Sequence, residues 1–186
     1  MVQTDEQIKE WERGKNTLAD GWDMEVLKEG IRKERLELSD GNVIRFSTEN
    51  CFDEKMPFIK IENGDTLSEK REDAIIQINP QSTTIQMLIH LSQDIGNPPL
   101  NEWKDTIVSD LKKIGKRTEN FRMEKLKYMD YICYEVSDLN IWTYNITFRM
   151  HKYERKIMGN YNCLKSDKRT WGLLLEALLH ENHSRL

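Results

Sequence analysis

The segment from Ile141 to Met150 constrains the fold more than any other part of the sequence. Its apolar residues alternate with polar ones over nine positions: Trp142, Tyr144, Ile146, Phe148 and Met150 are interleaved with Thr143, Asn145, Thr147 and Arg149. A period of two is typical of a β-strand that places one face on a core. Three more apolar segments predict strands: Phe121–Leu126, Tyr131–Val136 and Lys156–Leu164. Short turns separate these strands, so neighbours must pair antiparallel.

Two helices with apolar faces are predicted to cover this sheet. The first runs from Asn101, its expected N-cap, to Ile114, and its apolar face is Trp103, Ile107, Leu111 and Ile114. Gly115 follows it as a natural C-terminal stop. The second begins near Ser166–Asp167 and carries an amphipathic pattern, namely Trp171, Leu174, Leu175, Leu178 and Leu179.

The residues before the first predicted strand, 1–35, have a helical pattern. Thr4 and Gln7 have the spacing of a capping box, and Met24, Leu27 and Ile31 recur at helical spacing. This apolar stripe is thin, so we expect the segment to lie at the edge of the domain. The sequence therefore predicts a helical N-terminal extension, 1–35, followed by one α+β domain, 36–186.

The first half of that domain contains weaker strand signals. Leu36–Ser39 and Val43–Phe46 flank Asp40-Gly41, a dipeptide suited to a tight hairpin, although the apolar residues do not fit a two-residue turn. A loop is expected from Thr48 to Asp73, with a short strand at Phe58–Ile61. Strands are expected at Ala74–Asn79 and Thr84–Leu91. The predicted fold class is α+β: one antiparallel sheet of six to seven strands, flanked by helices as an α/β/α sandwich.

The composition indicates a chain with a solvated surface. Charged residues make up 32% of the 186 residues, and the net charge is −4. This average gives no general attraction to nucleic acid or to anionic lipid, so we expect neither as a partner. No apolar leader follows Met1, and if Met1 is the native start we expect a cytoplasmic protein. Cys133 and Cys163 lie in apolar strands and are interpreted as buried thiols.

No residue pattern predicts catalysis, a cofactor or a metal. His180 and His183 are close enough in sequence to share an ion, but no third ligand is fixed, and a solvated helix end explains them better. The basic cluster Lys112, Lys113, Lys116 and Arg117 lies at a helix C-terminus, where cations are favoured in any case. Neither a nucleophile elbow nor a phosphate-binding loop is present in the sequence.

A polar face of the sheet is the candidate binding surface. Its predicted members carry amide, hydroxyl or guanidinium groups: Gln77, Gln86, Asn145, Thr147, Arg149, Asn160 and Asn162. Amides both donate and accept hydrogen bonds, so such a face could hold an extended or helical polypeptide. A solvated sheet face with no ligand is the alternative interpretation.

From about Leu36 to Asn182 the chain resembles the PsbP-like superfamily. The resemblance is carried by Leu38–Phe46, by Leu100-Asn101-Glu102-Trp103, by Ile157–Cys163 and by Thr170-Trp171 before the Leu-rich helix. That superfamily includes the photosystem subunit PsbP, the Ran-binding Mog proteins, bacterial DcrB-type domains and Eag-type chaperones. The resemblance implies an α+β fold and a role in binding or assembly, with no active site to transfer.

The functional hypothesis is a non-enzymatic protein-binding module, an adaptor or chaperone for a secreted or assembled partner. An immunity or inhibitor protein that neutralises a toxin is the alternative, because the chain is small and mildly acidic. An enzyme of unrecognised type is the third hypothesis. The sequence does not set the oligomeric state.

Overall fold

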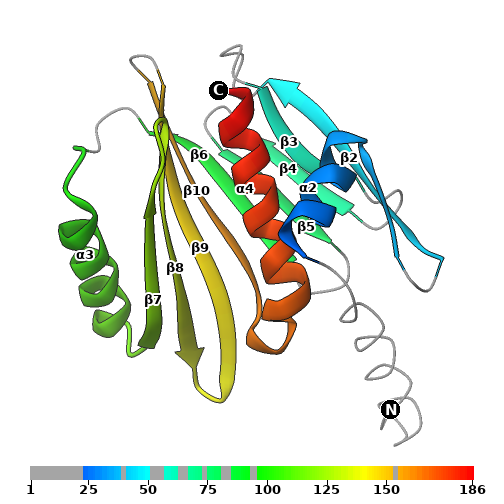
Figure 1. The fold of residues 1–186 in the computed structure, drawn as a ribbon. Helices are drawn as coiled ribbons and strands as arrows, with labels where there is room; N and C mark the ends of the chain where they lie inside the picture. The colour runs from blue at the N-terminus through cyan, green and yellow to red at the C-terminus, as the bar shows by residue number, and fades with distance from the viewer. Residues whose placement is uncertain are drawn as a thin grey trace, which may run out of the picture.

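The computed structural model describes residues 23–38, 41–50, 57–62, 67–72, 75–80, 85–92, 96–152 and 155–186. The helices in these ranges are α2 (Met24–Arg32), α3 (Leu100–Lys113) and α4 (Leu173–Arg185). The strands are β1 (Arg35–Glu37), β2 (Val43–Asn50), β3 (Pro57–Glu62), β4 (Leu67–Glu72), β5 (Ile75–Pro80), β6 (Ile85–Ser92), β7 (Arg117–Lys125), β8 (Met129–Asp138), β9 (Ile141–Lys152) and β10 (Arg155–Leu164). Figure 1 shows their arrangement.

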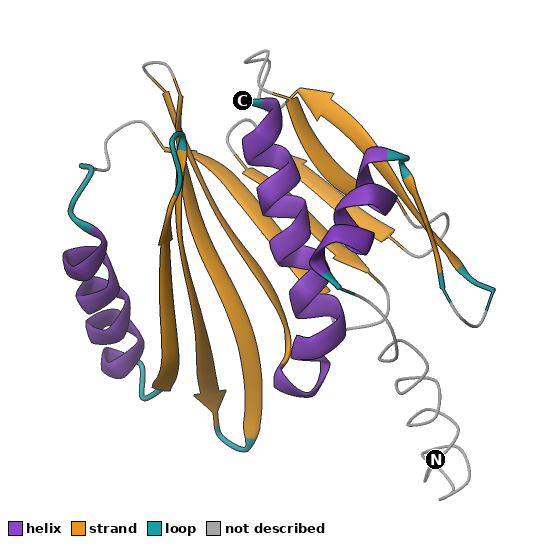
Figure 2. Ribbon diagram, viewed as in Figure 1, coloured by secondary structure: helices purple, strands orange, loops and turns teal. Residues whose placement is uncertain are grey.

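The strands form two antiparallel sheets within the described residues. A three-stranded sheet has the order β1-β2-β3, and a seven-stranded sheet has the order β4-β5-β6-β10-β9-β8-β7. The expected α+β class with antiparallel strands is confirmed. The expectation of a single sheet is wrong, because β1, β2 and β3 pair only with one another and form a second sheet (Figure 2).

Strand β10 joins the two halves of the larger sheet. The strands β4, β5 and β6 form one meander and β7, β8 and β9 form another, and β10 pairs with β6 on one side and β9 on the other. In this register Asn160 lies between Leu88 and Thr147. The position of β10 thus aligns side chains from both meanders on each face of the sheet.

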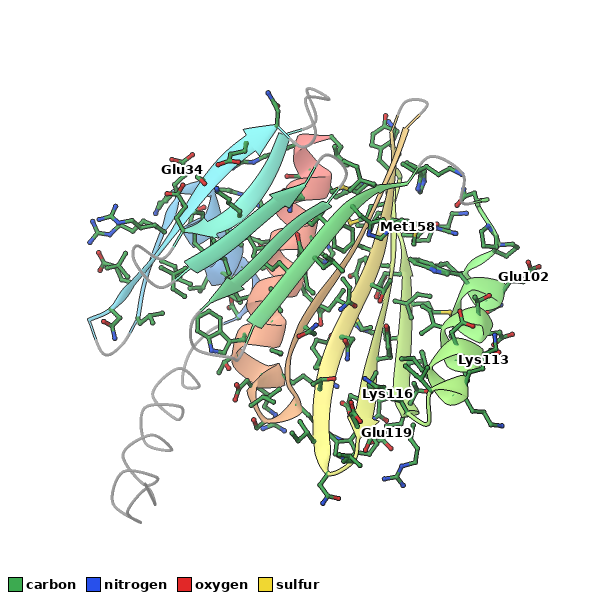
Figure 3. All side chains as sticks on the ribbon, turned by 180° about the vertical axis from the view of Figure 1, so that it is seen from behind. Glu34, Glu102, Lys113, Lys116, Glu119 and Met158 are labelled. Carbon is green, nitrogen blue, oxygen red and sulfur yellow. The ribbon has the colours of Figure 1, made fainter. Side chains whose placement is uncertain are left out.

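Helices α3 and α4 lie on opposite faces of the seven-stranded sheet. Under α4 is the larger core, which gathers apolar side chains from α2, from both sheets and from α4 itself. Under α3 is a smaller cluster of buried residues, Trp103, Ile132, Tyr134 and Val136. Helix α3 contacts mainly β7 and β8, so it covers one end of its face (Figure 3).

Helix α4 is buried on nearly every side. A 3₁₀ turn (Lys165–Asp167) and a π-helical turn (Lys168–Gly172) precede it, and Leu174, Leu175, Leu178 and Leu179 are fully buried as expected. Polar residues are buried as well, because the small sheet and α2 pack against the far side of the helix. Asn182 Oδ1 accepts a hydrogen bond of 2.7 Å from the backbone N–H of Ile59.

The solvated end predicted for this helix is therefore wrong. Glu181 is 4% exposed and binds Arg32 of α2 at 2.8 Å, while His180 lies 3.1 Å from the hydroxyl of Tyr131. Burial lowers the pKa of His180, and Lys28 lowers it further. Side-chain hydrogen bonds of His180, Glu181 and Asn182 thus attach α4 to its neighbours.

The structure of the β1–β2 hairpin explains why its apolar residues do not fit a two-residue turn. Leu36 pairs with Ile44, and both side chains are buried. The chain turns between Leu38 and Asn42, where the Leu38 N–H donates to the Asn42 carbonyl at 2.8 Å. Gly41 has a φ of 84°, which glycine adopts without strain. The turn is longer than two residues, and that length places both apolar residues on one face.

The loop predicted from Thr48 to Asp73 is wrong, because β2 continues to Asn50 and two further strands, β3 and β4, follow. The short strand expected within it is confirmed as β3. Strand β4 reads Leu67-Ser68-Glu69-Lys70-Arg71-Glu72, and it lies at the edge of the large sheet. Charged residues protect such edges from unwanted pairing, and they also remove the apolar alternation that reveals a strand.

Two helix predictions need correction at their ends. Helix α2 begins after Asp23, whose side chain accepts a hydrogen bond from the Val26 N–H, and its Leu27 and Ile31 lie in the main core rather than at its edge. In α3 the N-cap is Pro99 instead of Asn101, and Ile114 is 65% exposed rather than part of the apolar face. The expected Thr4–Gln7 capping box lies outside the described residues.

No helix among the described residues combines the length and the apolar character that a membrane span requires.

Candidate functional site

The register of the large sheet places all seven predicted binding positions on one face. Asn145 and Thr147 of β9 lie opposite Asn162 and Asn160 of β10. Position 86 of β6 lies opposite Asn162, and position 77 of β5 lies opposite Leu88, which itself pairs with Asn160. Because successive residues of a strand alternate between faces, these positions and Arg149 share the face that carries α3. We call it the α3-side face.

A chain of hydrogen bonds runs across this face. The Tyr134 hydroxyl lies 2.9 Å from Thr147 Oγ1, which lies 2.9 Å from Asn160 Oδ1. The Asn145 amide Nδ2 donates to Thr143 Oγ1 at 2.9 Å. Neighbouring side chains thus satisfy part of one another's hydrogen-bonding capacity, and the network holds their amide and hydroxyl groups in fixed orientations.

The face is less open than its composition indicates. Asn145 is 8% exposed and Arg149 is 6% exposed, whereas Thr147, Asn160 and Asn162 are half-buried. The predicted set therefore contains two kinds of residue. Of the five members whose side chains the structure describes, two stabilise the face from within and three are accessible to a ligand.

Arg149 is held by an internal ion pair that no pattern in the sequence indicates. Its Nε and one terminal nitrogen both donate to Asp130 Oδ2, at 3.1 and 2.8 Å, and the same terminal nitrogen donates to the carbonyl of Pro98. The guanidinium also lies 4.6 Å from the Trp103 ring centre, in cation–π geometry. The place of Asp130 on this face could have been inferred from its strand. Successive residues of β8 alternate between the two faces, which puts Asp130 on the same face as Ile132 and Tyr134.

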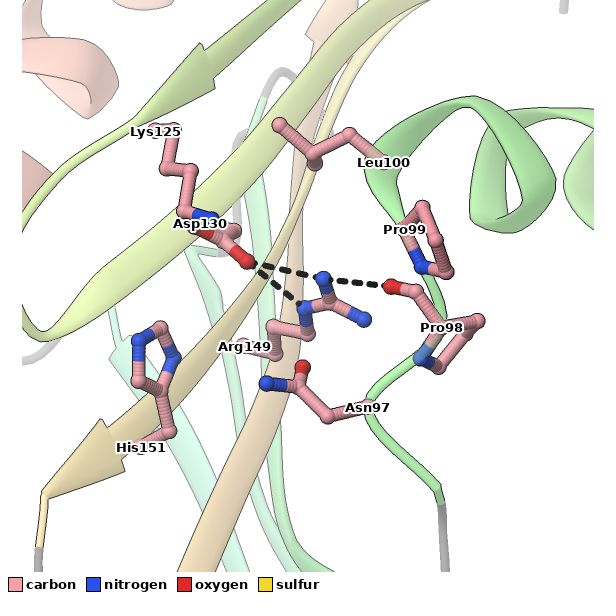
Figure 4. A pocket seen from close by; sticks show the side chains of 8 residues that line it. All are labelled: Asn97, Pro98, Pro99, Leu100, Lys125, Asp130, Arg149 and His151. Atoms are coloured by element: carbon pink, nitrogen blue, oxygen red, sulfur yellow. Dashed lines mark hydrogen bonds and ion pairs between the residues drawn. The ribbon is translucent and has the colours of Figure 1, made fainter.

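This ion pair lies at one wall of a pocket where α3 begins. The pocket has a volume of about 370 Å³ and is lined by Asn97, Pro98, Pro99, Leu100, Lys125, Asp130, Arg149 and His151 (Figure 4). Volumes of this order suit one large side chain or a small ligand. The prolines and Leu100 supply an apolar wall opposite the charged groups. An apolar wall facing a few fixed polar groups is the usual lining of a binding pocket.

Two buried polar atoms lie among the lining residues: Asp130 Oδ1, an acceptor, and His151 Nδ1, whose role depends on the tautomer of the ring. Neither atom has a hydrogen-bond partner within the described part of the chain. An unpaired buried acceptor is unfavourable, and an N–H or O–H donor would stabilise it. The pocket is therefore suited to a group that donates hydrogen bonds.

A second polar cluster lies on the opposite face, beneath α4. Glu176 of α4 accepts hydrogen bonds from Tyr144 and from Arg122, whose guanidinium also lies 3.4 Å from the Cys133 sulfur. Burial raises the pKa of Cys133 to about 11 and that of Cys163 to about 12. Both thiols are buried as predicted, and they stay protonated near neutral pH, which disfavours a nucleophilic role.

Glu135 ties the start of the C-terminal helical region to the sheet. It accepts from Asn120 at 2.9 Å, from Lys168 at 2.8 Å and from Lys165 at 2.6 Å. Burial opposes its ionisation, but the hydrogen bonds from Lys165, Lys168 and Asn120 outweigh burial and lower its pKa to about 2. Within the described ranges no group of three or more His, Cys, Asp or Glu side chains could hold a metal ion.

The fold resembles that of a known protein at low sequence identity. The solution structure of cyanobacterial PsbP (CyanoP) from Synechocystis sp. PCC 6803 matches with a TM-score of 0.53 and 9% identity, over 73% of this chain and 90% of that one. This likeness confirms a PsbP-like fold and extends no further.

A putative regulator of unknown function from Pseudomonas aeruginosa, PA94, matches with a TM-score of 0.35 and 8% identity, over 66% of this chain and 85% of that chain. No protein-family model and no curated protein matches the chain.

Proposed function

We propose that this chain is a non-enzymatic protein-binding module, an adaptor or chaperone that holds a segment of a partner on the α3-side face. The observation that carries the proposal is the uncovered part of that face. Among the described residues no helix lies over β6 there, and α3 contacts mainly β7 and β8, with Met158 of β10 packed against the border of the cluster under α3 (Figure 3). Leu88, Met158 and Asn160 are half-buried in this region.

The chemistry of the face favours a polypeptide guest over a charged small molecule. Thr147 and Asn160 offer hydroxyl and amide groups, and Leu88 and Met158 lie beside them on the same face. Mixed amide and apolar side chains can bind both the polar and the apolar atoms of a peptide segment. The pocket beside Asp130 would receive one donor side chain of that segment, with the two prolines against its apolar part.

The resemblance to PsbP-like proteins is consistent with this function by analogy of fold alone. We place the chain with the Mog, DcrB-type and Eag-type members as a working hypothesis. In that hypothesis the partner is secreted or assembled into a complex, and the chain acts from the cytoplasm.

The test is to block the uncovered face with a charge. Tagged wild-type protein, Leu88→Lys and Val26→Lys are used to capture partners from the native cell lysate, and any captured protein is then purified and titrated against each variant. Val26 is 46% exposed on α2, so it is a matched aliphatic control away from the face. We expect Leu88→Lys to lose at least tenfold in affinity and Val26→Lys to bind as wild type.

Circular dichroism melting must show that both variants remain folded. Equal binding by all three proteins, or an empty capture, would overturn the proposal. The dependence on salt separates the two binding roles. Binding that persists at high salt fits an adaptor that holds its partner through apolar contacts. Binding to a basic partner that is abolished by salt would instead favour the immunity role.

A further inference from the structure

Three large apolar side chains are exposed at one end of the molecule. Leu139 is 91% exposed, Ile141 is 60% exposed and Ile114 is 65% exposed. Leu139 lies in the turn between β8 and β9, Ile141 begins β9, and Ile114 is the C-cap of α3. We call these three residues the apolar tip. Because they contribute nothing to either core, packing within the chain does not account for their apolar character.

The contacts around these residues show that they belong to one end of the structure. Lys116, two residues after Ile114, forms an ion pair of 3.0 Å with Asp138, the neighbour of Leu139. Arg117 pairs in the sheet with Ser137, and Asp138 pairs with Ile141. Figure 1 shows the end of α3 and the β8–β9 turn at the same end of the sheet.

Leu139 has a backbone conformation that its side chain does not favour. Its φ is 57°, in the left-handed region that glycine and asparagine adopt more readily. A turn selected only for folding would have glycine or asparagine at this position. A leucine that is both in this conformation and almost fully exposed points to a role outside the fold.

Basic side chains surround the apolar tip. In this region Lys112, Lys113, Lys116, Arg117, Lys165 and Lys168 outnumber the carboxylates Asp110, Glu119, Glu135, Asp138 and the buried Asp167. The first four of these carboxylates are engaged in ion pairs with lysines. Lys112 and Arg117 are exposed, and neither forms an ion pair with a carboxylate in the described ranges. Figure 3 labels Lys113 and Lys116 at this end.

An aromatic residue completes the arrangement. Trp142 follows Ile141, and its ring lies 4.6 Å from Lys165 Nζ and 5.8 Å from the Arg117 guanidinium carbon. Tryptophan beside cations, next to exposed aliphatic groups, is a composition characteristic of surfaces that meet the boundary between lipid and water. The net charge of −4 for the whole chain conceals this local excess of positive charge.

We propose that this end of the molecule docks on an anionic membrane surface, with Leu139 and Ile141 entering the headgroup region and the basic side chains binding lipid phosphates. A bilayer fits these features better than a protein partner does. Stable protein interfaces bury broad surfaces with a packed core, and three side chains at a turn and a helix end provide too little area. Shallow insertion into lipid needs only a few apolar side chains when basic residues reinforce it. This docking is additional to partner binding on the α3-side face.

The test is flotation of the full chain with vesicles of equal parts phosphatidylglycerol and phosphatidylcholine, beside vesicles of phosphatidylcholine alone. We expect binding to the anionic vesicles at low ionic strength and weaker binding as salt is added. The double variant Leu139→Ser/Ile141→Ser should lose about tenfold or more in affinity, because each side chain no longer buries apolar surface. Lys112→Gln/Arg117→Gln should weaken binding to anionic vesicles as well.

Val26→Ser is the matched control, since it removes an exposed aliphatic side chain from another element, and it should float as wild type. All substituted residues are exposed, so the variants should melt as wild type does. Failure of the wild-type chain to float with anionic vesicles at low salt would overturn the proposal. So would equal flotation of wild type and Leu139→Ser/Ile141→Ser. Loss of a protein partner in that variant, without vesicle binding by wild type, would assign the tip to a protein interface instead.

Discussion

The two faces of the large sheet are used in different ways. On the face under α4, tyrosines, leucines and isoleucines from nine of the described elements form a continuous core, and even the carboxylates of Glu176 and Glu181 are buried. On the α3-side face the apolar cluster buried among the described residues is small, with Met158 of β10 packed at its border, and no described helix lies over β6. The α4 face stabilises the fold, and the α3-side face holds polar groups in place, with Asn145 and Arg149 buried and Thr147, Asn160 and Asn162 half-buried.

This difference indicates where substitutions harm folding and where they harm binding. Residues that lie on α4 should respond to truncation as core residues, whereas those on α3 should respond as residues of a partly solvated interface. The candidate site can therefore vary without loss of the fold, except where the Asp130–Arg149 pair anchors it.

The largest expected effect is truncation under α4. Leu178→Ala should lower the free energy of unfolding by about 4 kcal/mol, since it opens a cavity beside a fully buried side chain. The equivalent change on α3, Leu111→Ala, removes a half-buried side chain and should cost about 1 kcal/mol. Urea denaturation of both variants measures the difference. Equal losses would show that the two helices contribute alike, which contradicts the comparison.

Removing one partner of the buried ion pair should have the next largest effect. Arg149→Met leaves Asp130 buried and uncompensated, and it should cost about 3 kcal/mol. The double variant Asp130→Leu/Arg149→Met removes both charges and should recover most of that loss. A double variant as unstable as the single one would show that the pair contributes through its geometry, including the bond to the Pro98 carbonyl.

Adding a methyl group at Gly159 tests the close packing on the α4 side. A Cβ there would lie 2.3 Å from Phe148 Cζ and 2.8 Å from the Leu88 carbonyl oxygen, so Gly159→Ala should cost about 2 kcal/mol. Gly96→Ala is the matched control, because its Cβ would meet nothing within 4 Å. A thermal melt compares the two variants, and similar melting temperatures would indicate that β10 can shift to accommodate the methyl group.

The smallest expected effect is a dependence of stability on acidity. Because the folded pKa of Glu135 is lowered to about 2 from an ordinary 4.5, its ionised form contributes stability above pH 4.5. That contribution is lost as the pH falls from 4.5 toward 2. We expect about 1 kcal/mol, since Lys165 and Lys168 are partly exposed and screened. Glu135→Gln should flatten this part of the profile in melts recorded across acid pH, and an unchanged slope would exclude Glu135 as its source.

Sequence patterns predicted the elements that have one apolar face and one polar face. The alternation in β9 and the stripe of α3 are of this kind, and the same alternation placed the seven polar positions on one face. Helix α4 departs from the pattern because it is covered on both sides, so Glu181 and Asn182 are buried where an amphipathic helix would expose them. Strand β4 was not predicted, because an edge strand with charged residues has no alternation of apolar and polar residues to detect.

The pocket could not be predicted from a local pattern. It depends on Pro98 and Pro99, which lie before α3, meeting Asp130 and Arg149 from two strands further along the chain. A sequence shows neither that contact nor the ion pair beneath it. The second sheet was not predicted for a related reason, since the sequences of β1, β2 and β3 do not indicate which strands they pair with.

The position of β10 has a consequence for how the protein is made. The two meanders are complete before β10 is synthesised, yet each presents an open edge until residues 155–164 leave the ribosome and pair with β6 and β9. The pairing of β10 with β6 spans a long stretch of chain, which slows the step that closes the sheet. Nascent chains that stall before this strand should be the ones that aggregate or recruit folding helpers, because two unpaired strand edges and an uncovered core remain exposed together.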